Sequence, residues 1–232
     1  MKFLVRRMLI AFVTMIMAAT GVLTLATPAQ AVNTSPNYAF FFTPHQDDEV
    51  LSMGAAIQAM TNAGRPVYVV LLTDGGSSQY CTKNNAPLNW TTKAQCVAGR
   101  DAEFTNGVKS MGAIPIIRTD RAVDGQLQVS YAQYIINLYH TNYPNASLRG
   151  MSQYDASNDH RAIGIALNNL NLYPLSNWLV KQSERGTTGC AMSAQYDQNA
   201  TLDFYVFGHI SVPGDFTVAT YPTGNYSCAY SH

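Results

Sequence analysis

Two continuous apolar runs predict buried strands, Tyr38–Phe42 and Pro66–Leu72. Both are rich in aromatic or β-branched residues, and the absence of polar alternation is typical of parallel strands covered on both faces. The segment between them, Glu49–Ala63, has the pattern of a helix and is followed by Gly64, a favoured helix stop. Strand, helix and strand within about 35 residues form a βαβ unit.

Helices and strands continue to alternate through the middle of the chain. Helices are predicted at 92–111, 128–140 and 162–170, and strands at 114–118 and 147–154. The last part differs, because strands are predicted at 192–196 and 202–210 and within the turn-rich segment 214–230. We therefore predict an α/β fold with a mostly parallel sheet flanked by helices and a β-rich C-terminal extension.

The first residues have the features of a secretory signal peptide. A positively charged start precedes an apolar segment from Met8 to about Leu25, and Ala29-Gln30-Ala31 supplies small residues at the A-x-A positions. We expect residues 1–31 to be removed and residues 32–232 to be exported as one domain. A retained membrane anchor is the alternative. No later segment approaches the ~20 apolar residues that span a bilayer, so no membrane contact is expected after cleavage.

Charge and composition narrow the possible partners. The 232 residues include 14 Lys+Arg and 14 Asp+Glu, and charged residues make up only 12% of the chain. There is no basic stripe, which argues against nucleic acid as a partner. Nothing in the pattern implies a protein partner, and a composition rich in uncharged polar residues and tyrosine fits a secreted protein that handles a neutral polar ligand.

The four cysteines all follow the predicted cleavage point. An even number of cysteines in an exported chain implies disulfides, and four cysteines allow three connectivities. We favour Cys81–Cys96 and Cys190–Cys228, each of which closes a modest loop. No C-x-x-C spacing occurs, which argues against a cysteine zinc site.

Three acids and an imidazole lie where the first predicted strand turns into the first predicted helix. The stretch is His45-Gln46-Asp47-Asp48-Glu49, and ligands of open α/β sheets bind at this edge. Adjacent carboxylates repel one another and are costly to desolvate, and a divalent cation removes both problems. His45 and Asp48 can ligate the cation while Asp47 faces a bound water. The alternative is that Asp48 and Glu49 only stabilise a helix N-terminus.

Four short motifs follow one another across about residues 38–170. They are Pro44-His45-Gln46-Asp47-Asp48-Glu49, Leu72-Thr73-Asp74-Gly75-Gly76, Arg100-Asp101-Ala102-Glu103 and Asn158-Asp159-His160-Arg161-Ala162. In sequence and order they resemble the motifs of the PIG-L (LmbE-like) family of zinc-dependent N-acetylglucosamine deacetylases. The resemblance implies a Rossmann-like sheet, one zinc ion per chain held by His45, Asp48 and His160, and Asp47 as general base.

The implied ligands agree with the chemistry of zinc. Two imidazoles and one carboxylate, with water in the remaining position, make an open catalytic site. Iron, cobalt or nickel are also chemically admissible with these ligands. The alternative for His160 is a residue at a helix start, with Asn158 or Asp159 as the cap.

The resemblance also suggests supporting residues. Asp159 is expected to hold a neighbouring imidazole in place. Arg100 resembles a position at the rim of the site that binds substrate hydroxyls, and its alternative is an ion pair with Glu103. Asp74 could accept hydrogen bonds from sugar hydroxyls or simply support a turn, and the turn is the role we favour.

One position departs from the family pattern. Family members commonly have a histidine three residues before the last ligand, as a proton donor or oxyanion stabiliser, and here that residue is Ser157. Serine cannot donate a proton as an imidazolium does, although Ser157 can still contact substrate. His209, at the end of the predicted strand 202–210, is our candidate for the missing group. Its alternative is a surface residue of that strand.

The resemblance implies a secreted zinc-dependent hydrolase that removes an N-acyl group, expected to be acetyl, from an amino-sugar-containing substrate. The substrate could be an N-acetylglucosaminyl saccharide or a larger acylated glycoside. A different class is a secreted carbohydrate-binding protein that keeps the metal but has little or no turnover. Ser157 motivates that alternative, and Asp47 argues against it because a pure binding site has no need of a spare carboxylate.

Overall fold

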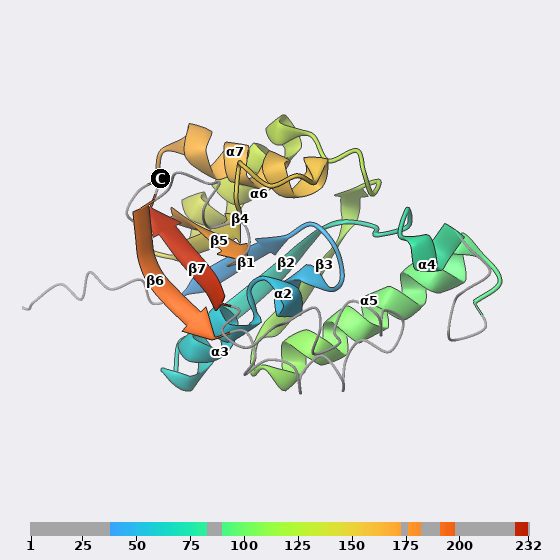
Figure 1. Ribbon diagram of the computed structural model, residues 1–232, viewed down its shortest axis with the longest axis horizontal. Helices are drawn as coiled ribbons and strands as arrows, with labels where there is room; N and C mark the ends of the chain where they lie inside the picture. The colour runs from blue at the N-terminus through green and yellow to red at the C-terminus, as the bar shows by residue number, and fades with distance from the viewer. Residues whose placement is uncertain (1–37, 83–89, 173–175, 182–190, 198–225, 232) are drawn as a thin grey trace, which may run out of the picture. The chain divides into compact units, whose positions relative to one another are not determined.

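The computed structural model describes residues 38–82, 90–172, 176–181, 191–197 and 226–231, all within the larger of the chain's two units, Ser35–His232. Its strands are β1 (Ala39–Thr43), β2 (Val67–Thr73), β3 (Ile114–Ala122), β4 (Ser147–Met151), β5 (Ser176–Lys181), β6 (Ala191–Asp197) and β7 (Tyr226–Ser231). Its helices are α2 (Asp48–Leu51), α3 (Gly54–Asn62), α4 (Gln79–Thr82), α5 (Lys93–Ser110), α6 (Val129–Asn142) and α7 (Asn158–Leu170) (Figure 1).

The described strands form one sheet in the order β3-β2-β1-β4-β5-β7-β6. The first five are parallel, and β7 pairs antiparallel with both β5 and β6. At the centre, Phe40 of β1 lies opposite Tyr68 of β2 and Leu148 of β4. The predicted mostly parallel α/β sheet is confirmed, and the antiparallel pair β6–β7 falls in the predicted β-rich C-terminal part.

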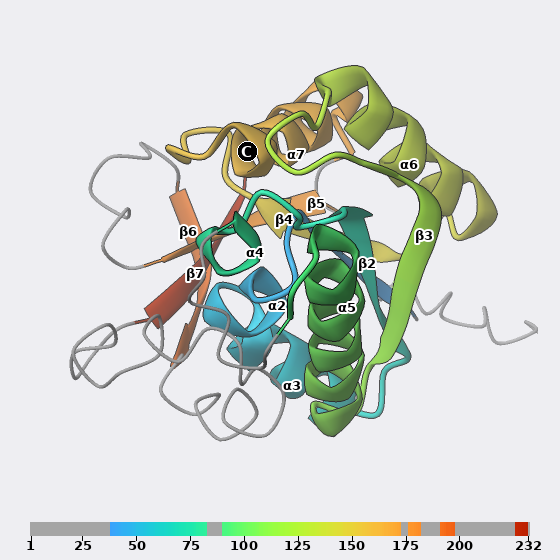
Figure 2. The same ribbon diagram turned by 90° about the vertical axis from the view of Figure 1, so that its right-hand side faces the viewer.

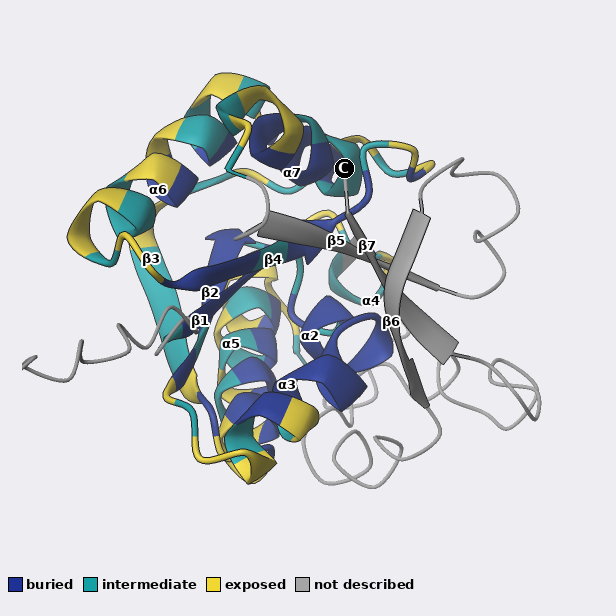
Figure 3. Ribbon diagram, turned by 90° about the vertical axis from the view of Figure 1, so that its left-hand side faces the viewer, coloured by how far each residue is buried: buried dark blue, intermediate teal, exposed yellow. Residues whose placement is uncertain are grey.

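Helices cover both faces of the parallel part of the sheet. Phe41 of β1 belongs to the hydrophobic cluster on the side of α3 and α5, whereas Phe40 and Phe42 belong to the cluster on the side of α6 and α7. Figures 2 and 3 show these two pairs of helices on opposite sides of β1 and β2. All three phenylalanines are fully buried. This two-sided cover is why β1 and β2 are continuously apolar.

The predicted single helix Glu49–Ala63 is wrong. The structure divides this segment into α2, which has Ser52 as its C-cap, and α3, which has Met53 as its N-cap; Met53 lies outside the helical conformation, with φ −120°. The break leaves α2 at the edge of the sheet, while Met53 and Ile57 are buried in the core beneath it. The other predicted helix boundaries lie within a few residues of those observed. Thr92, for example, caps α5 through a capping box with Gln95.

Two strands differ from prediction. β3 continues to Ala122 rather than ending at residue 118, and its register against β2 shifts between Leu71 and Thr73. As an edge strand it accommodates Pro115, which has no N–H to donate to a second neighbour. β5 was not predicted. The predicted strand 202–210 lies outside the described residues.

The predicted disulfide between Cys81 and Cys96 is confirmed, and it joins α4 to α5. Of the second predicted pair, Cys228 lies in β7 and Cys190 is outside the described residues. The predicted signal peptide, residues 1–31, is outside them as well. No helix in the described part of the chain is long and apolar enough to cross a membrane.

Candidate metal centre and active site

The predicted site residues gather at the carboxyl ends of four neighbouring strands. The motif of His45 follows β1, the loop of Asp74 follows β2, the loop of Asp124 follows β3, and β4 leads to α7, which carries His160. Figure 2 shows α2 and α4 beside β1 at this edge. Parallel strands end at the same edge, so residues far apart in the sequence meet there.

His45, Asp48 and His160 direct one ligand atom each toward a common point. His45 Nδ1 and His160 Nε2 both lie 3.1 Å from Asp48 Oδ2, and the two nitrogens are 3.3 Å apart. The three side chains are largely buried, with exposed fractions of 17%, 5% and 12% in that order. The structure therefore brings together the three residues expected to hold a metal.

This arrangement fits zinc. A tetrahedral zinc ion with ligand bonds of about 2.0–2.1 Å separates neighbouring ligand atoms by about 3.3 Å. The observed separations of 3.1, 3.1 and 3.3 Å match that value. Two imidazoles and a carboxylate also leave a fourth position for water or substrate.

A second set of candidate ligands shares His45. His45 Nε2 lies 3.1 Å from Asp124 Oδ1 and 3.1 Å from Asp159 Oδ2. A neutral imidazole carries one N–H and one lone pair, so one histidine cannot ligate through both nitrogens. The Asp159 carboxylate also accepts the backbone N–H groups of Gly125 and Leu127, at 2.7 and 3.0 Å. Asp159 is therefore placed to accept the His45 Nε2–H.

The electrostatics of the site match a place for a cation. Burial alone would lower the pKa of His160, but the carboxylates of Asp48 and Asp155 outweigh it and raise that pKa to about 9. Burial likewise opposes protonation of His45, yet contacts with Asp124, Asp159 and Asp48 raise its pKa well above the ordinary value. Burial would raise the pKa of Asp48, and the two histidines instead lower it well below the usual range. The carboxylates around the two histidines therefore stabilise a positive charge at this site.

Two of these acids were not predicted from the sequence. Asp155 Oδ2 lies 3.0 Å from His160 Nδ1, and Asp124 faces His45. Each carboxylate lies on the ring nitrogen opposite the one that faces the proposed metal, an arrangement common around metal-bound histidines. Asp155 could have been suspected because it lies five residues before His160. Asp124 offers only a Val-Asp-Gly turn as a signal.

Asp47 does not belong to either set of candidate ligands. It occupies the N-cap position of α2 without capping it, and its Oδ2 lies 3.2 Å from Arg100 Nη2. Arg100 is almost fully buried and also donates through Nη1 to the carbonyl oxygen of Gly75, 3.0 Å away. The guanidinium therefore holds a carboxylate beside the candidate metal ligands.

The side chain of Gln46 connects the loop after β2 to helix α5. Its Nε2 donates to the carbonyl of Asp74 and to Asp101 Oδ1, both at 2.9 Å. Asp101 in turn forms a two-pronged ion pair with Arg121 of β3. Gly75 has φ +61°, and a Cβ there would lie 1.8 Å from Gln46 Oε1. Only glycine fits this conformation and this close approach.

Asp74 organises the loop after β2. Its Oδ1 accepts the backbone N–H of Gly76 at 3.0 Å and that of Asp124 at 2.9 Å. Its Oδ2 lies 3.9 Å from Lys93 Nζ. These contacts are those of a residue that supports a turn and joins it to the neighbouring loop.

A match to a known family decides the classification. The family model described as PIG-L, GlcNAc-PI de-N-acetylase, matches residues 40–170, more than half of the chain. The chain belongs to the PIG-L family. Among curated proteins, none matches its sequence.

Solved structures share the fold of this PIG-L protein at low sequence identity. The A40926 pseudoaglycone deacetylase Dbv21 has a TM-score of 0.60 and 14% identity, with coverage of 84% of this chain and 97% of that one. N,N'-diacetylchitobiose deacetylase from Pyrococcus horikoshii has a TM-score of 0.58 and 16% identity, with coverage of 80% and 74%. GalB, the 4-carboxy-2-hydroxymuconate hydratase of Pseudomonas putida KT2440, has a TM-score of 0.56 and 12% identity, with coverage of 83% and 95%. The fold therefore serves more than one chemistry.

Of the two remaining predicted site residues of this PIG-L protein, the structure describes Ser157 but not His209. Ser157 is the N-cap residue of α7, and its backbone N–H donates to Asp155 Oδ1 at 2.8 Å. This contact links the position of the missing family histidine to the carboxylate beside His160. His209 lies outside the described residues, so its expected role stays a prediction.

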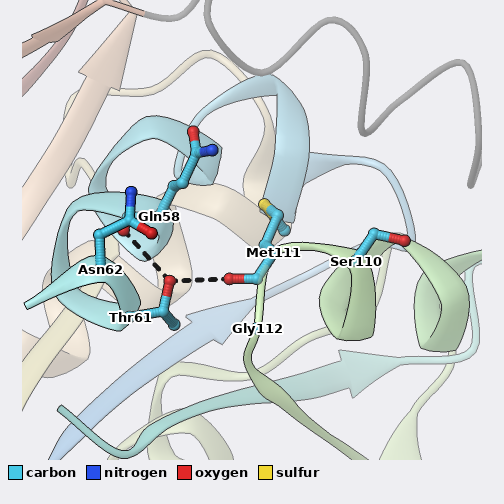
Figure 4. Close-up of a pocket in the computed structure, with 6 residues that line it drawn as sticks. All are labelled: Gln58, Thr61, Asn62, Ser110, Met111 and Gly112. Atoms are coloured by element: carbon cyan, nitrogen blue, oxygen red, sulfur yellow. Dashed lines mark hydrogen bonds between the residues drawn. The ribbon is translucent and has the colours of Figure 1, made fainter. Parts of the chain in front are cut away.

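A polar pocket of this PIG-L protein lies at the opposite edge of the sheet, where α3 and α5 end. It is lined by Gln58, Thr61, Asn62, Ser110, Met111 and Gly112 (Figure 4). Thr61 Oγ1 lies 2.8 Å from the carbonyl oxygen of Met111 and 3.1 Å from that of Gln58, which share its one hydroxyl proton. None of the lining side chains is charged or titratable, so the pocket offers hydrogen bonds but no general base or imidazole ligand.

Proposed function

We propose that this protein is a zinc-dependent amide hydrolase that removes an N-acetyl group from an amino-sugar-containing substrate. The observation that carries the proposal is the carboxylate of Asp47, held by Arg100 beside the three-ligand set of His45, Asp48 and His160. A metal-binding protein without turnover has no need of that additional base. The PIG-L match and the two deacetylases of similar fold support the reaction class.

Each residue of the site has a separate role in the proposed reaction. Zinc bound by His45, Asp48 and His160 would supply a water of lowered pKa and a Lewis acid for the acyl carbonyl. Asp47 is the general base that takes the proton of the attacking water, and Arg100 fixes its carboxylate. The oxygen of that water bonds to the acyl carbon, the C–N bond breaks, and Asp47 returns the proton it took to the leaving nitrogen, so that acetate and the free amino sugar are released.

We propose further that the protein acts outside the cell that makes it. The signal-peptide pattern of residues 1–31 supports export. The Cys81–Cys96 disulfide fits an oxidising compartment. Sequencing the N-terminus of protein recovered from the medium tests this directly. A start at Val32 supports export, and an intact Met1 in the cytoplasmic fraction contradicts it.

The activity is tested by acetate release from N-acetylglucosamine and short chitooligosaccharides. The mature protein is stripped of metal and reconstituted with zinc, beside Asp47→Asn, His160→Ala and the control Asp120→Asn, whose carboxylate is exposed and paired with Arg118. We expect zinc-dependent release by the wild type and the control and none by the other two. Stoichiometric zinc without release from any substrate would rule out simple amino-sugar deacetylation. Larger acylated glycosides would be tested next. If none of them is hydrolysed, the remaining alternative is a carbohydrate-binding protein that keeps the metal but has little or no turnover.

A further inference from the structure

Asp124 ties together the loops that follow three strands. Its backbone N–H donates to Asp74 Oδ1 at 2.9 Å, and its carbonyl accepts from Ser77 Oγ at 3.0 Å. Its Oδ2 accepts the backbone N–H of Ser77 at 2.9 Å, and its Oδ1 lies 3.1 Å from His45 Nε2. With one carboxylate oxygen held by Ser77, the other is fixed toward the imidazole.

This geometry has a consequence for the two nitrogens of His45. Carboxylates only accept hydrogen bonds, and they lie at both ring nitrogens, Asp48 at Nδ1 and the pair Asp124 and Asp159 at Nε2, each 3.1 Å away. When a cation takes the point that Nδ1 shares with Asp48, the proton stays on Nε2. The neutral ring then has its lone pair on Nδ1. That atom lies 3.1 Å from Asp48 Oδ2 and 3.3 Å from His160 Nε2, within the three-ligand set.

We propose that Asp124 is a positioning residue that holds His45 in the Nε2–H tautomer and aims its Nδ1 at the metal. Asp159 approaches the same N–H from α7, fixed by the backbone of Gly125 and Leu127. Asp124 approaches from the loop after β3, so the two carboxylates share the proton and restrain the ring from two elements. The inference rests on metal binding, which is part of the proposed function.

The test is the zinc affinity of Asp124→Asn, measured by competition with a chromophoric chelator. An amide oxygen can replace one carboxylate oxygen but not both, so either Ser77 or His45 loses its acceptor. Loss of such a partner weakens metal binding by about 10–100-fold, and with Asp159 still present we expect about tenfold. The His45 Nε2–H proton signal of the zinc-loaded protein should also broaden or vanish by NMR, with KM unchanged.

Two control variants separate this role from a purely structural one. Asp120→Asn removes an exposed carboxylate of β3, the strand that leads to Asp124, and Ser77→Ala removes the hydroxyl bond to the Asp124 carbonyl while leaving its carboxylate in place. Both should bind zinc as the wild type does. A raised KM with unchanged zinc affinity in Asp124→Asn would assign Asp124 to substrate and overturn the inference. Lower thermal stability with unchanged zinc affinity would overturn it as well.

The failure of the proposed function would look different. In that case the wild type itself would bind no zinc in the competition assay, or would bind it without amide hydrolysis. Wild-type binding with an equally tight Asp124→Asn variant overturns only the role of Asp124. Absent wild-type binding overturns both.

Discussion

Asp47 and Arg100 are 53 residues apart in the sequence and form an ion pair beside the candidate metal ligands, with 3.2 Å between Oδ2 and Nη2. The side chain of Arg100 is 3% exposed and that of Asp47 is 16% exposed. The guanidinium is thus part of the buried support, and the carboxylate is the part that reaches solvent. We expected Arg100 to bind substrate hydroxyls or to pair with Glu103, and neither alternative included this contact.

The first prediction concerns this pair. Asp47→Asn should lower kcat by about 10²–10⁴-fold, the usual effect of losing a general base. Arg100→Met should lower kcat roughly tenfold, or ~1.4 kcal/mol of barrier, because the base is no longer held in place. In the Asp47→Asn background the Arg100 substitution should add little, because residues that act as a unit are not additive.

Steady-state kinetics of the two single variants and the double variant measure this coupling. Arg118→Met removes an arginine from an exposed ion pair with Asp120 and should leave kcat unchanged. Full additivity would contradict the coupling. An increase in KM alone for Arg100→Met would return Arg100 to substrate binding.

The second prediction is a pH dependence of metal affinity. A histidine must lose its proton to ligate zinc, and the pKa of His160 is raised to about 9 by Asp48 and Asp155 despite burial. Zinc affinity should therefore rise with pH up to about 9, and zinc binding near neutral pH should release protons. Isothermal titration calorimetry in buffers of different ionisation enthalpy measures the protons released. Affinity that is flat between pH 6.5 and 9 would contradict the assignment of His160.

In the metal-free protein, the same two histidines should make the stability of the fold decrease as pH rises. A raised folded-state pKa stabilises the folded protein fully below the unfolded value of about 6.5. That contribution is lost as pH rises through about 9 for His160, and the raised pKa of His45 acts in the same direction. The stripped protein should therefore melt at a lower temperature at pH 9.5 than at pH 6.5. An unchanged or higher melting temperature would contradict it.

The third prediction concerns Gly75. Gly64→Ala is a matched control, because Gly64 also has a positive φ, +74°, but an added Cβ would meet nothing within 4 Å. The control should lose about 1 kcal/mol of unfolding free energy from backbone strain alone. Gly75→Ala should lose a further ~1–3 kcal/mol from overpacking against Gln46, and kcat should fall because the carbonyl of Gly75 holds Arg100. Equal urea midpoints for the two variants would contradict the close contact.

The fourth prediction concerns the disulfide. Replacing Cys81 and Cys96 together by alanine should lower the free energy of unfolding by about 3 kcal/mol, as expected for a closed loop of about 15 residues. Urea denaturation of the double variant measures this. The substitution is more selective than a reductant, which would also act on the predicted Cys190–Cys228 pair. An unchanged midpoint would show that the crosslink constrains little of the unfolded chain.

The sequence predicted the parts of the fold that local pattern determines. The apolar runs of β1 and β2 and the stop at Gly64 follow from burial on both faces and from backbone freedom. The break at Ser52 and the extension of β3 to Ala122 depend on packing between distant elements. No local pattern encodes such packing.

The candidate site was likewise predictable only for residues that lie in local motifs. His45, Asp48 and His160 lie in motifs at strand ends, so their meeting could be expected from an α/β topology. Asp124 is a single acid in a turn, and its contact with His45 arises only because β3 is longer than its apolar core. The pairing of Arg100 with Asp47 likewise depends on how α5 packs beside α2.

The position of the metal is the most direct test of the account. A crystal of the zinc-loaded protein would be measured above and below the zinc absorption edge. We predict one anomalous peak per chain, about 2.0–2.1 Å from His45 Nδ1, Asp48 and His160 Nε2. A peak on the opposite side of the ring, between His45 Nε2, Asp124 and Asp159, would contradict the account, as would no peak at either position.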